Sequence, residues 1–342
     1  MFGERRSRSP LGSILTAVVV FAIAASCAML GWLAYFALAP GPVFDQPKLF
    51  TVNSGQGLRQ IAQSLEEEGL VESADRFTLL VRVLGRSGDI KAGSYEAEAP
   101  LSPLALLDKL TRGEFAQGQI RFIEGWTFRQ VRAALDAHPS LRHDTRDFSA
   151  QEILDRLGIA EKHPEGLFFP DTYYFAAGTS DLTILRQAYD RQKSILGKHW
   201  ERRAAGLPLR SPYEALVLAS IVEKETGQPD EREMIAAVFL NRLRKGMRLQ
   251  ADPTVIYGLA ESFDGNLRKR DLQTDQPYNS YTRYGLPPTP IALPGEAAIA
   301  ATLNPASSSA LYFVARGDGS HQFSKTLEEH NRAVNRFQRS GR

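Results

Sequence analysis

The sequence has 342 residues and a single cysteine, Cys27, which lies inside its longest apolar run. Everything that follows Cys27 is free of cysteine. A catalytic thiolate, a zinc site built from cysteines and a disulfide scaffold are therefore excluded for most of the chain.

A large net charge is also missing. The chain has 41 Lys and Arg residues against 39 Asp and Glu residues, a formal net charge of +2. Three arginines and one glutamate in the first ten residues account for this excess, so the rest of the chain is neutral overall. A neutral body is poorly suited to neutralising many phosphates, and we expect no nucleic-acid partner.

Sequence motifs for metals, cofactors and serine nucleophiles are missing as well. No two histidines have the i, i+4 spacing of a zinc-binding helix. The chain contains no Gly-x-Ser-x-Gly string and no glycine-rich phosphate loop. We therefore expect neither a metal nor a cofactor. The histidines are His138, His143, His163, His199, His321 and His330.

A long apolar segment lies near the N-terminus. No charged residue occurs from Ser9 to Phe44, and residues 11–39 contain no proline. About 20 apolar residues suffice to cross a bilayer, so residues 11–39 are predicted to form a single transmembrane helix in contact with membrane lipid. The arginines within residues 1–10 favour a cytoplasmic tail, which places the remaining chain on the outer side of the cell (inner) membrane.

Two other interpretations of the apolar segment remain open. A cleaved signal peptide also starts with basic residues, but its apolar core spans only about 7–15 residues. A buried core helix is the other alternative, although an uninterrupted apolar run of this length is unusual in a soluble domain. An uncleaved anchor is the preferred interpretation.

The chain beyond the anchor is predicted to be of the α+β class and to form two domains. Residues 47–115 have the pattern of a small α+β module, in which strand-like segments alternate with amphipathic helices. Residues 120–340 are predicted to form a larger mixed α+β domain. The alternative is that the module is only the first layer of one larger domain.

A helix predicted to begin at Ser211 carries the strongest candidate for a catalytic residue. Residues 215–222 of this helix are uncharged, which is typical of a buried helix, and Glu223 follows directly. Burial disfavours the charged form of a carboxyl group, so a glutamate there can stay protonated and act as a general acid. Periodicity does not separate Glu223 from Glu225. A third interpretation is that both residues begin a solvated last turn.

Three further segments have structural interpretations. The aromatic-rich residues 165–175 are predicted to form a core segment rather than a sugar-stacking surface. Asp230 and Asp252 each precede a helical pattern and are predicted to be N-cap residues.

Several strings of the sequence are long enough to be specific, at residues 91–95, 123–127, 169–173, 218–226, 241–243, 247–257 and 278–281. Taken together, these strings resemble the endolytic murein transglycosylases of the YceG-like family, which are membrane-anchored enzymes that cut peptidoglycan glycan strands. Residues 52–58 with Ile61 and Ala62 resemble, more weakly, a peptidoglycan-binding LysM unit. The resemblance implies that the module at 47–115 is LysM-like and that residues 120–340 are the transglycosylase catalytic domain.

The resemblance also implies a reaction and a set of site residues. The catalytic acid of the family is the first glutamate of the Ile-Val-Glu-Lys-Glu-Thr string, which corresponds to Glu223. One carboxyl group protonates the glycosidic oxygen between MurNAc and GlcNAc and then helps the C6 hydroxyl close a 1,6-anhydro ring, without water. Gln250, Asp252 and Tyr281 are carried over as substrate-binding residues. Peptidoglycan glycan strands are the implied partner, nascent strands would be terminated, and the cell-wall synthesis machinery is a candidate partner.

Two other functions are alternatives to this one. A membrane-tethered muramidase would hydrolyse the same bond, with Glu223 as acid and Asp252 as the second carboxylate. A non-catalytic scaffold would bind glycan through the module at residues 47–115. The products of peptidoglycan digestion separate these functions, because only the lytic enzyme leaves 1,6-anhydro ends.

Overall fold

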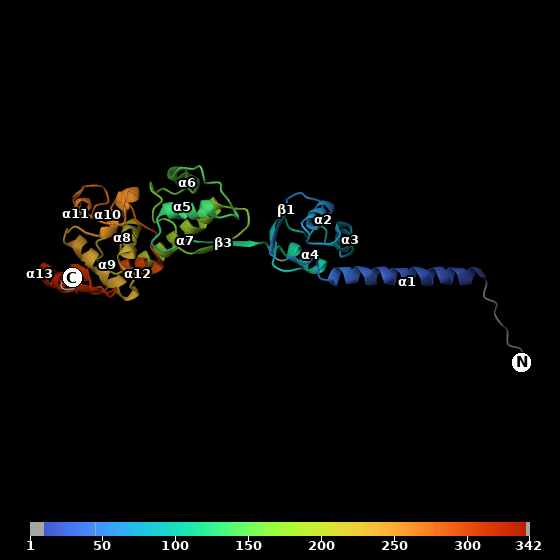
Figure 1. Ribbon diagram of the computed structural model, residues 1–342. Helices are drawn as coiled ribbons and strands as arrows, with labels where there is room; N and C mark the ends of the chain where they lie inside the picture. The colour runs from blue at the N-terminus through green and yellow to red at the C-terminus, as the bar shows by residue number, and fades with distance from the viewer. Residues whose placement is uncertain (1–9, 45, 340–342) are drawn as a thin grey trace, which may run out of the picture. The chain divides into compact units, whose positions relative to one another are not determined.

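The computed structural model describes residues 10–44 and 46–339, and its first element is the long helix α1, Pro10–Leu38 (Figure 1). Among these residues one helix is long and apolar enough to cross a membrane, with a mean hydropathy of 2.3 over its most apolar part. Only 6% of that part is buried inside the protein. The exposure argues against the core-helix interpretation. The predicted tail lies, except for Pro10, outside the described residues.

The chain divides into two compact units, and the first contains α1 and a small module with its own core. Strands β1 and β2 of the module pair in antiparallel fashion, with Phe50 opposite Tyr95. Ser102 caps helix α4, with proline in its first turn, and Gly113 ends it at φ 74°. The bounds are β1 Lys48–Val52, α2 Leu58–Glu67, α3 Ala74–Val83, β2 Gly93–Ala97 and α4 Pro103–Arg112.

The second unit begins at Gln119 and contains most of the helices. The helices of this unit are α5 Phe128–Ala137, α6 Ala150–Arg156, α7 Asp181–Glu201, α8 Pro212–Glu225, α9 Arg232–Arg244, α10 Asp252–Leu259, α11 Lys269–Gln273, α12 Glu296–Leu303 and α13 Leu327–Val334. Short 3-10 turns occupy Pro229–Glu231 and Ala260–Ser262, and a π-helical turn occupies Asn335–Arg339.

The strands are short and pair two by two within the described residues. Strand β1 pairs with β2, β3 with β5, β4 with β6, and β7 with β8. The predicted α+β class is therefore confirmed. The remaining strands are β3 Gln117–Arg121, β4 Leu141–Arg142, β5 Thr172–Ala176, β6 Thr179–Ser180, β7 Tyr312–Ala315 and β8 His321–Ser324.

Helix α8 is the buried helix that the sequence predicts. Ser211 accepts a hydrogen bond from the N–H of Glu214 at the start of α8, and residues 215–222 are all buried. Helices α7, α9, α10 and α12 pack against it. Ser220, a polar side chain in this run, donates to the Val217 carbonyl and accepts from the Ile291 N–H, so its hydroxyl is satisfied. The fold thus encloses α8 up to its last turn.

The predicted N-caps at Asp230 and Asp252 are wrong. Asp230 lies in the 3-10 turn Pro229–Glu231, and α9 starts after Glu231 without a side-chain cap. Asp252 is the first residue of α10 itself, because Ala251 takes the N-cap position. The carboxylate of Asp252 is therefore free for another partner.

The prediction of a core segment at residues 165–175 is confirmed. Three aromatic side chains of this segment, Phe168, Tyr173 and Phe175, join the main core of the second unit. Phe169 is also buried, whereas Tyr174 is 64% exposed. The buried members are Phe168, Phe169, Tyr173 and Phe175.

Candidate active site

Glu223 lies on the last turn of α8 and meets the start of α12. Its Oε2 accepts a hydrogen bond of 3.0 Å from the backbone N–H of Gly295, the N-cap residue of α12. Burial raises the pKa of Glu223, and the nearby Glu124 adds to this effect. The Gly295 N–H acts in the opposite direction, because it stabilises the anion. The protonated form of the Glu223 carboxyl group is therefore favoured. The Gly295 N–H can still stabilise the carboxylate after the proton is lost.

The turn that carries Glu124 is fixed beside Glu223 by backbone hydrogen bonds. Gly125 donates to the Leu293 carbonyl at 2.8 Å, and Leu293 donates to the Trp126 carbonyl at 2.7 Å. Gly125 has φ 77°, and a β-carbon at this position would lie 4.0 Å from Cγ of Glu223. The left-handed φ favours glycine at this position, whereas a β-carbon would only be in ordinary van der Waals contact with Glu223 and Lys224.

A methyl group on Gly295 is expected to disturb this contact. A β-carbon there would collide with the Glu124 carboxylate, although the φ of −72° suits any residue. Gly295→Ala should displace the Glu124 carboxylate, the movable end of a side chain, and should lower the rate of glycan cleavage about tenfold, because small misplacements near reacting groups are costly.

The matched control for this variant is Gly227→Ala. Gly227 follows α8, and a β-carbon there would meet nothing within 4 Å. Rates on purified peptidoglycan, with thermal unfolding as a check of folding, would compare the two variants. Equal activity of Gly295→Ala and the wild type would contradict the importance of this contact.

Glu225 lies on the opposite side of α8, since two residues along a helix are about 200° apart. Burial and the neighbouring Asp252 raise the pKa of Glu225 to about 8, against the lowering effect of Arg242. Its Oε1 is buried and has no hydrogen-bond partner among the described residues. Glu225 is therefore protonated at neutral pH.

The three predicted substrate-binding residues gather on the side of Glu225. Asp252 accepts a hydrogen bond of 2.5 Å from the hydroxyl of Tyr281, and the Gln250 side chain lies 3.4 Å from an Arg242 nitrogen. Gln250 has φ 51°, which is uncommon for a residue other than glycine and often marks a functional position. Within the described part of the chain, Glu223 interacts with none of these three residues.

A cleft of about 1030 Å³ opens beside Glu223. Its walls include the start of α5, most of α10 and residues 258–263, and also Gly125 and Lys224, which flank Glu223. The Lys224 ammonium group donates to the Gly125 carbonyl at 3.3 Å. Glu223 itself is not part of the wall, but its neighbours Gly125 and Lys224 are, which puts it at the edge of the cleft.

Sequence reasoning missed one carboxyl group in the cleft wall, that of Glu165. This side chain is only 3% exposed and accepts hydrogen bonds from the Phe128 N–H at 2.8 Å and the Tyr257 hydroxyl at 3.0 Å. Burial raises its pKa to about 7. Glu165 joins the start of α5 to α10, two walls of the cleft. The one available signal was a charge directly before a dense aromatic segment.

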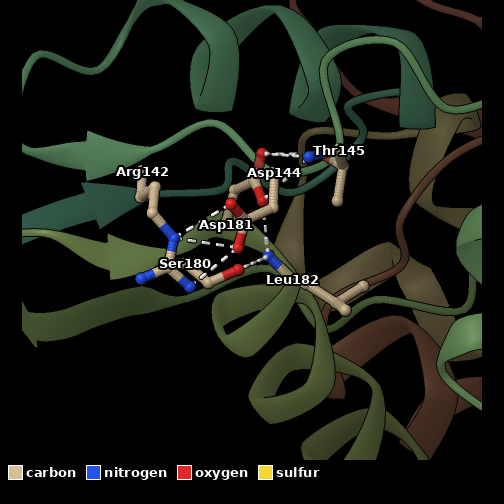
Figure 2. A network of polar contacts seen from close by, with 6 residues as sticks. All are labelled: Arg142, Asp144, Thr145, Ser180, Asp181 and Leu182. Carbon is tan, nitrogen blue, oxygen red and sulfur yellow. Dashed lines mark hydrogen bonds and ion pairs between the residues drawn. The ribbon is translucent and has the colours of Figure 1, made fainter.

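One group of side chains in the second unit has the composition of a metal site. Possible ligand atoms of Asp136, His143 and Asp181 lie within 4.8 Å of one another. Figure 2 shows, however, that Asp181 is engaged by Thr145 and Leu182. Each Asp181 oxygen accepts two hydrogen bonds, from backbone N–H groups and the Thr145 hydroxyl. Its lone pairs are already used, so we assign Asp181 to fixing the start of α7.

Comparison with known proteins gives consistent results. The model of the YceG-like family matches residues 50–336. An endolytic murein transglycosylase of Bacillus subtilis is 33% identical over 303 residues, which cover 84% of this chain and 83% of that protein. One of Streptococcus pneumoniae is 26% identical over 317 residues, covering 83% of this chain and 57% of the longer protein. The crystal structure of a YceG-like protein from Listeria monocytogenes has a TM-score of 0.55 and 31% identity, and the match covers 84% of this chain and 98% of that one.

Proposed function

The chain belongs to the YceG-like family, and we propose that it is an endolytic murein transglycosylase in which Glu223 is the catalytic residue. Its substrate is peptidoglycan. The enzyme cleaves the β-1,4 bond between MurNAc and GlcNAc without water and leaves 1,6-anhydro-MurNAc ends. The observation that carries the role of Glu223 is its position: a partly buried carboxyl group at the edge of a large cleft, with a backbone donor for its anion.

The reaction needs one group that gives a proton and then takes one back. The protonated Glu223 donates to the glycosidic oxygen while the bond from C1 of MurNAc to this oxygen breaks. The Glu223 anion, held by the Gly295 N–H, then accepts the proton of the C6 hydroxyl as the C6 oxygen bonds to C1. Glu223 ends protonated, as it began, and no nucleophilic side chain is consumed.

We favour Glu223 over Glu225 because of what surrounds each group. Glu223 has neighbours in the wall of the cleft and a donor for its charged form. Glu225 has a buried oxygen without a partner and lies beside Asp252, so its anion would be poorly stabilised. Gln250, Asp252 and Tyr281, which lie near Glu225, are proposed to bind the glycan further along the groove.

The same position of Asp252 weakens the hydrolytic alternative. A muramidase would need a second carboxylate facing the same bond as Glu223. Asp252 instead interacts with Tyr281 and Glu225, on the other side of α8. Mass analysis of sacculi digested by the wild type tests the reaction: we expect anhydro-muramyl ends, and reducing ends would support hydrolysis instead.

The proposal extends to the N-terminal unit. Helix α1 is proposed to anchor the enzyme in the cell membrane as a single span, with the N-terminus in the cytoplasm and the catalytic unit outside.

Residues 47–115 are proposed to be a LysM-like module that binds glycan. The cell-wall synthesis machinery is proposed to be a partner of the enzyme. Support for the module comes from its separate core and from the turn at residues 53–57 between β1 and α2. Sacculus binding by a Glu223→Gln chain would test glycan recognition without cleavage.

A further inference from the structure

Helix α1 is longer than a bilayer requires. Its 29 residues extend about 43 Å at 1.5 Å per residue, whereas the hydrocarbon core is about 30 Å thick. About two turns are therefore left over for contacts outside the hydrocarbon. The C-terminal turns have such contacts, because Leu33, Phe36 and Ala37 are buried together with Leu80 of α3.

The joint between α1 and the module is packed. The guanidinium group of Arg76, on α3, lies 5.3 Å from the ring centroid of Trp32, on α1. After α1 ends, Gly41 lies so close to the backbone of Leu101 and Leu70 that a β-carbon would collide with the Leu101 carbonyl. The module is thus held against the end of α1, within the first unit, rather than hanging from a free linker.

This joint fixes the level of α3 relative to the bilayer. Tryptophans near the end of a membrane helix lie at the level of the lipid headgroups. Trp32 is in that position, with 45% of its surface exposed. Arg76 stacks on Trp32, so the start of α3 lies at the same level.

Helix α3 has one buried face and one open face. Phe77, Leu80 and Val81 are buried, whereas Leu79 and Val83 are 37% and 55% exposed. Leu79 and Val83 are four residues apart and therefore lie on the same side of the helix. Leu84, directly after α3, is also 44% exposed.

Positive charge accompanies these apolar side chains. Arg76 and Arg82 are exposed, and Arg82 makes no ion pair with the described residues. The acidic groups at the start of α3 are already close to arginines: Asp75 lies 3.9 Å from Arg59, and Glu72 lies 4.0 Å from Arg76. An exposed face with apolar and basic residues is typical of helices that lie in a membrane surface.

We propose that the open face of α3, formed by Arg76, Leu79, Arg82 and Val83, binds the outer surface of the membrane in which α1 is anchored. Leu79 and Val83 enter the boundary between headgroups and acyl chains, and the arginines contact anionic headgroups. This inference rests on the proposed anchoring by α1. The contact of α3 with the membrane holds the module at the membrane surface, so that glycan must be bound by the other faces of the module.

Depth-dependent fluorescence quenching tests the proposal on the full chain. The protein, with Cys27→Ala, is reconstituted into vesicles of phosphatidylcholine and phosphatidylglycerol and labelled with an environment-sensitive dye at V83C or, as matched control, at E66C on α2. Glu66 is exposed on the same module. We expect quenching by lipid-borne nitroxides at V83C to exceed that at E66C at least about twofold. Equal quenching at both sites would overturn the surface contact.

Flotation of the same vesicles separates this inference from the anchor on which it rests. If the protein floats with the vesicles but V83C is quenched no more than E66C, the anchor stands and the contact of α3 is wrong. If the protein does not float, the anchor fails and the contact fails with it. A chain with Leu79→Ser and Val83→Ser should still float, because α1 is intact.

Discussion

Glu223→Gln should abolish nearly all glycan cleavage, with a loss of about 10²- to 10⁴-fold, the usual contribution of a general acid. Glutamine has the shape of a protonated glutamate and can still accept the Gly295 N–H, so the fold should be retained. The variant cannot supply a proton to the glycosidic oxygen. Activity would be measured as soluble products released from sacculi, with thermal unfolding as a check of folding.

The competing variant is Glu225→Gln. Because the pKa of Glu225 is raised to about 8, this group is already neutral at pH 7, and a glutamine copies its state. We expect a much smaller loss than for Glu223→Gln. If Glu225→Gln lost cleavage and Glu223→Gln kept it, the catalytic acid would be Glu225.

The raised pKa of Glu223 also predicts that the wild type loses activity as the pH rises and this group ionises.

The stability of the catalytic unit should fall as the pH is raised from about 6.5 to 8. The pKa values of Glu165 and Glu225 are raised to about 7 and about 8 in the folded chain, against 4.5 as the ordinary value. Above pH 4.5 the unfolded state gains by ionising these groups while the folded state keeps them protonated. Each group lowers the free energy of unfolding by about 1.4 kcal/mol per pH unit until its folded pKa is reached.

This pH window isolates the buried carboxyl groups. Burial lowers the pKa of His163 and His330 below 6.5, so any contribution of these histidines to stability rises with pH, opposite in sign to the predicted fall. Asp144 and Asp275, whose pKa values are lowered to about 2 by hydrogen bonds from arginines, affect stability only in acid.

Glu225→Gln should flatten the dependence of the free energy of unfolding on pH between pH 7 and 8. Glu201→Gln, at an exposed position at the end of α7, should leave this dependence unchanged. Urea unfolding at several pH values, followed by near-UV circular dichroism, measures the effect. Stability that is constant or rises over this range would contradict the burial of both groups.

The sequence was informative where the signal was local. Ser211 and the uncharged residues 215–222 predict a buried helix, because capping and burial leave a pattern within one element. The choice between Glu223 and Glu225 depends on residues outside α8. Their surroundings are set by α12 on one side and α10 on the other, which lie far away in the sequence.

The errors have the same origin. Asp252 was expected to cap a helix, but α10 starts one residue earlier than that role requires, and the carboxylate binds Tyr281, 29 residues away. Glu165 was missed because its partners Phe128 and Tyr257 are 37 and 92 residues away. Tertiary packing decides which polar groups are enclosed, and periodicity within one segment does not report it.

The most direct test of the account is digestion of sacculi by the wild-type enzyme in ¹⁸O-labelled water, with mass analysis of the glycan ends. Cleavage by Glu223 with ring closure through the C6 hydroxyl predicts 1,6-anhydro-MurNAc ends that contain no ¹⁸O. Reducing ends that carry ¹⁸O would show that water attacks the bond, and would contradict the proposed reaction.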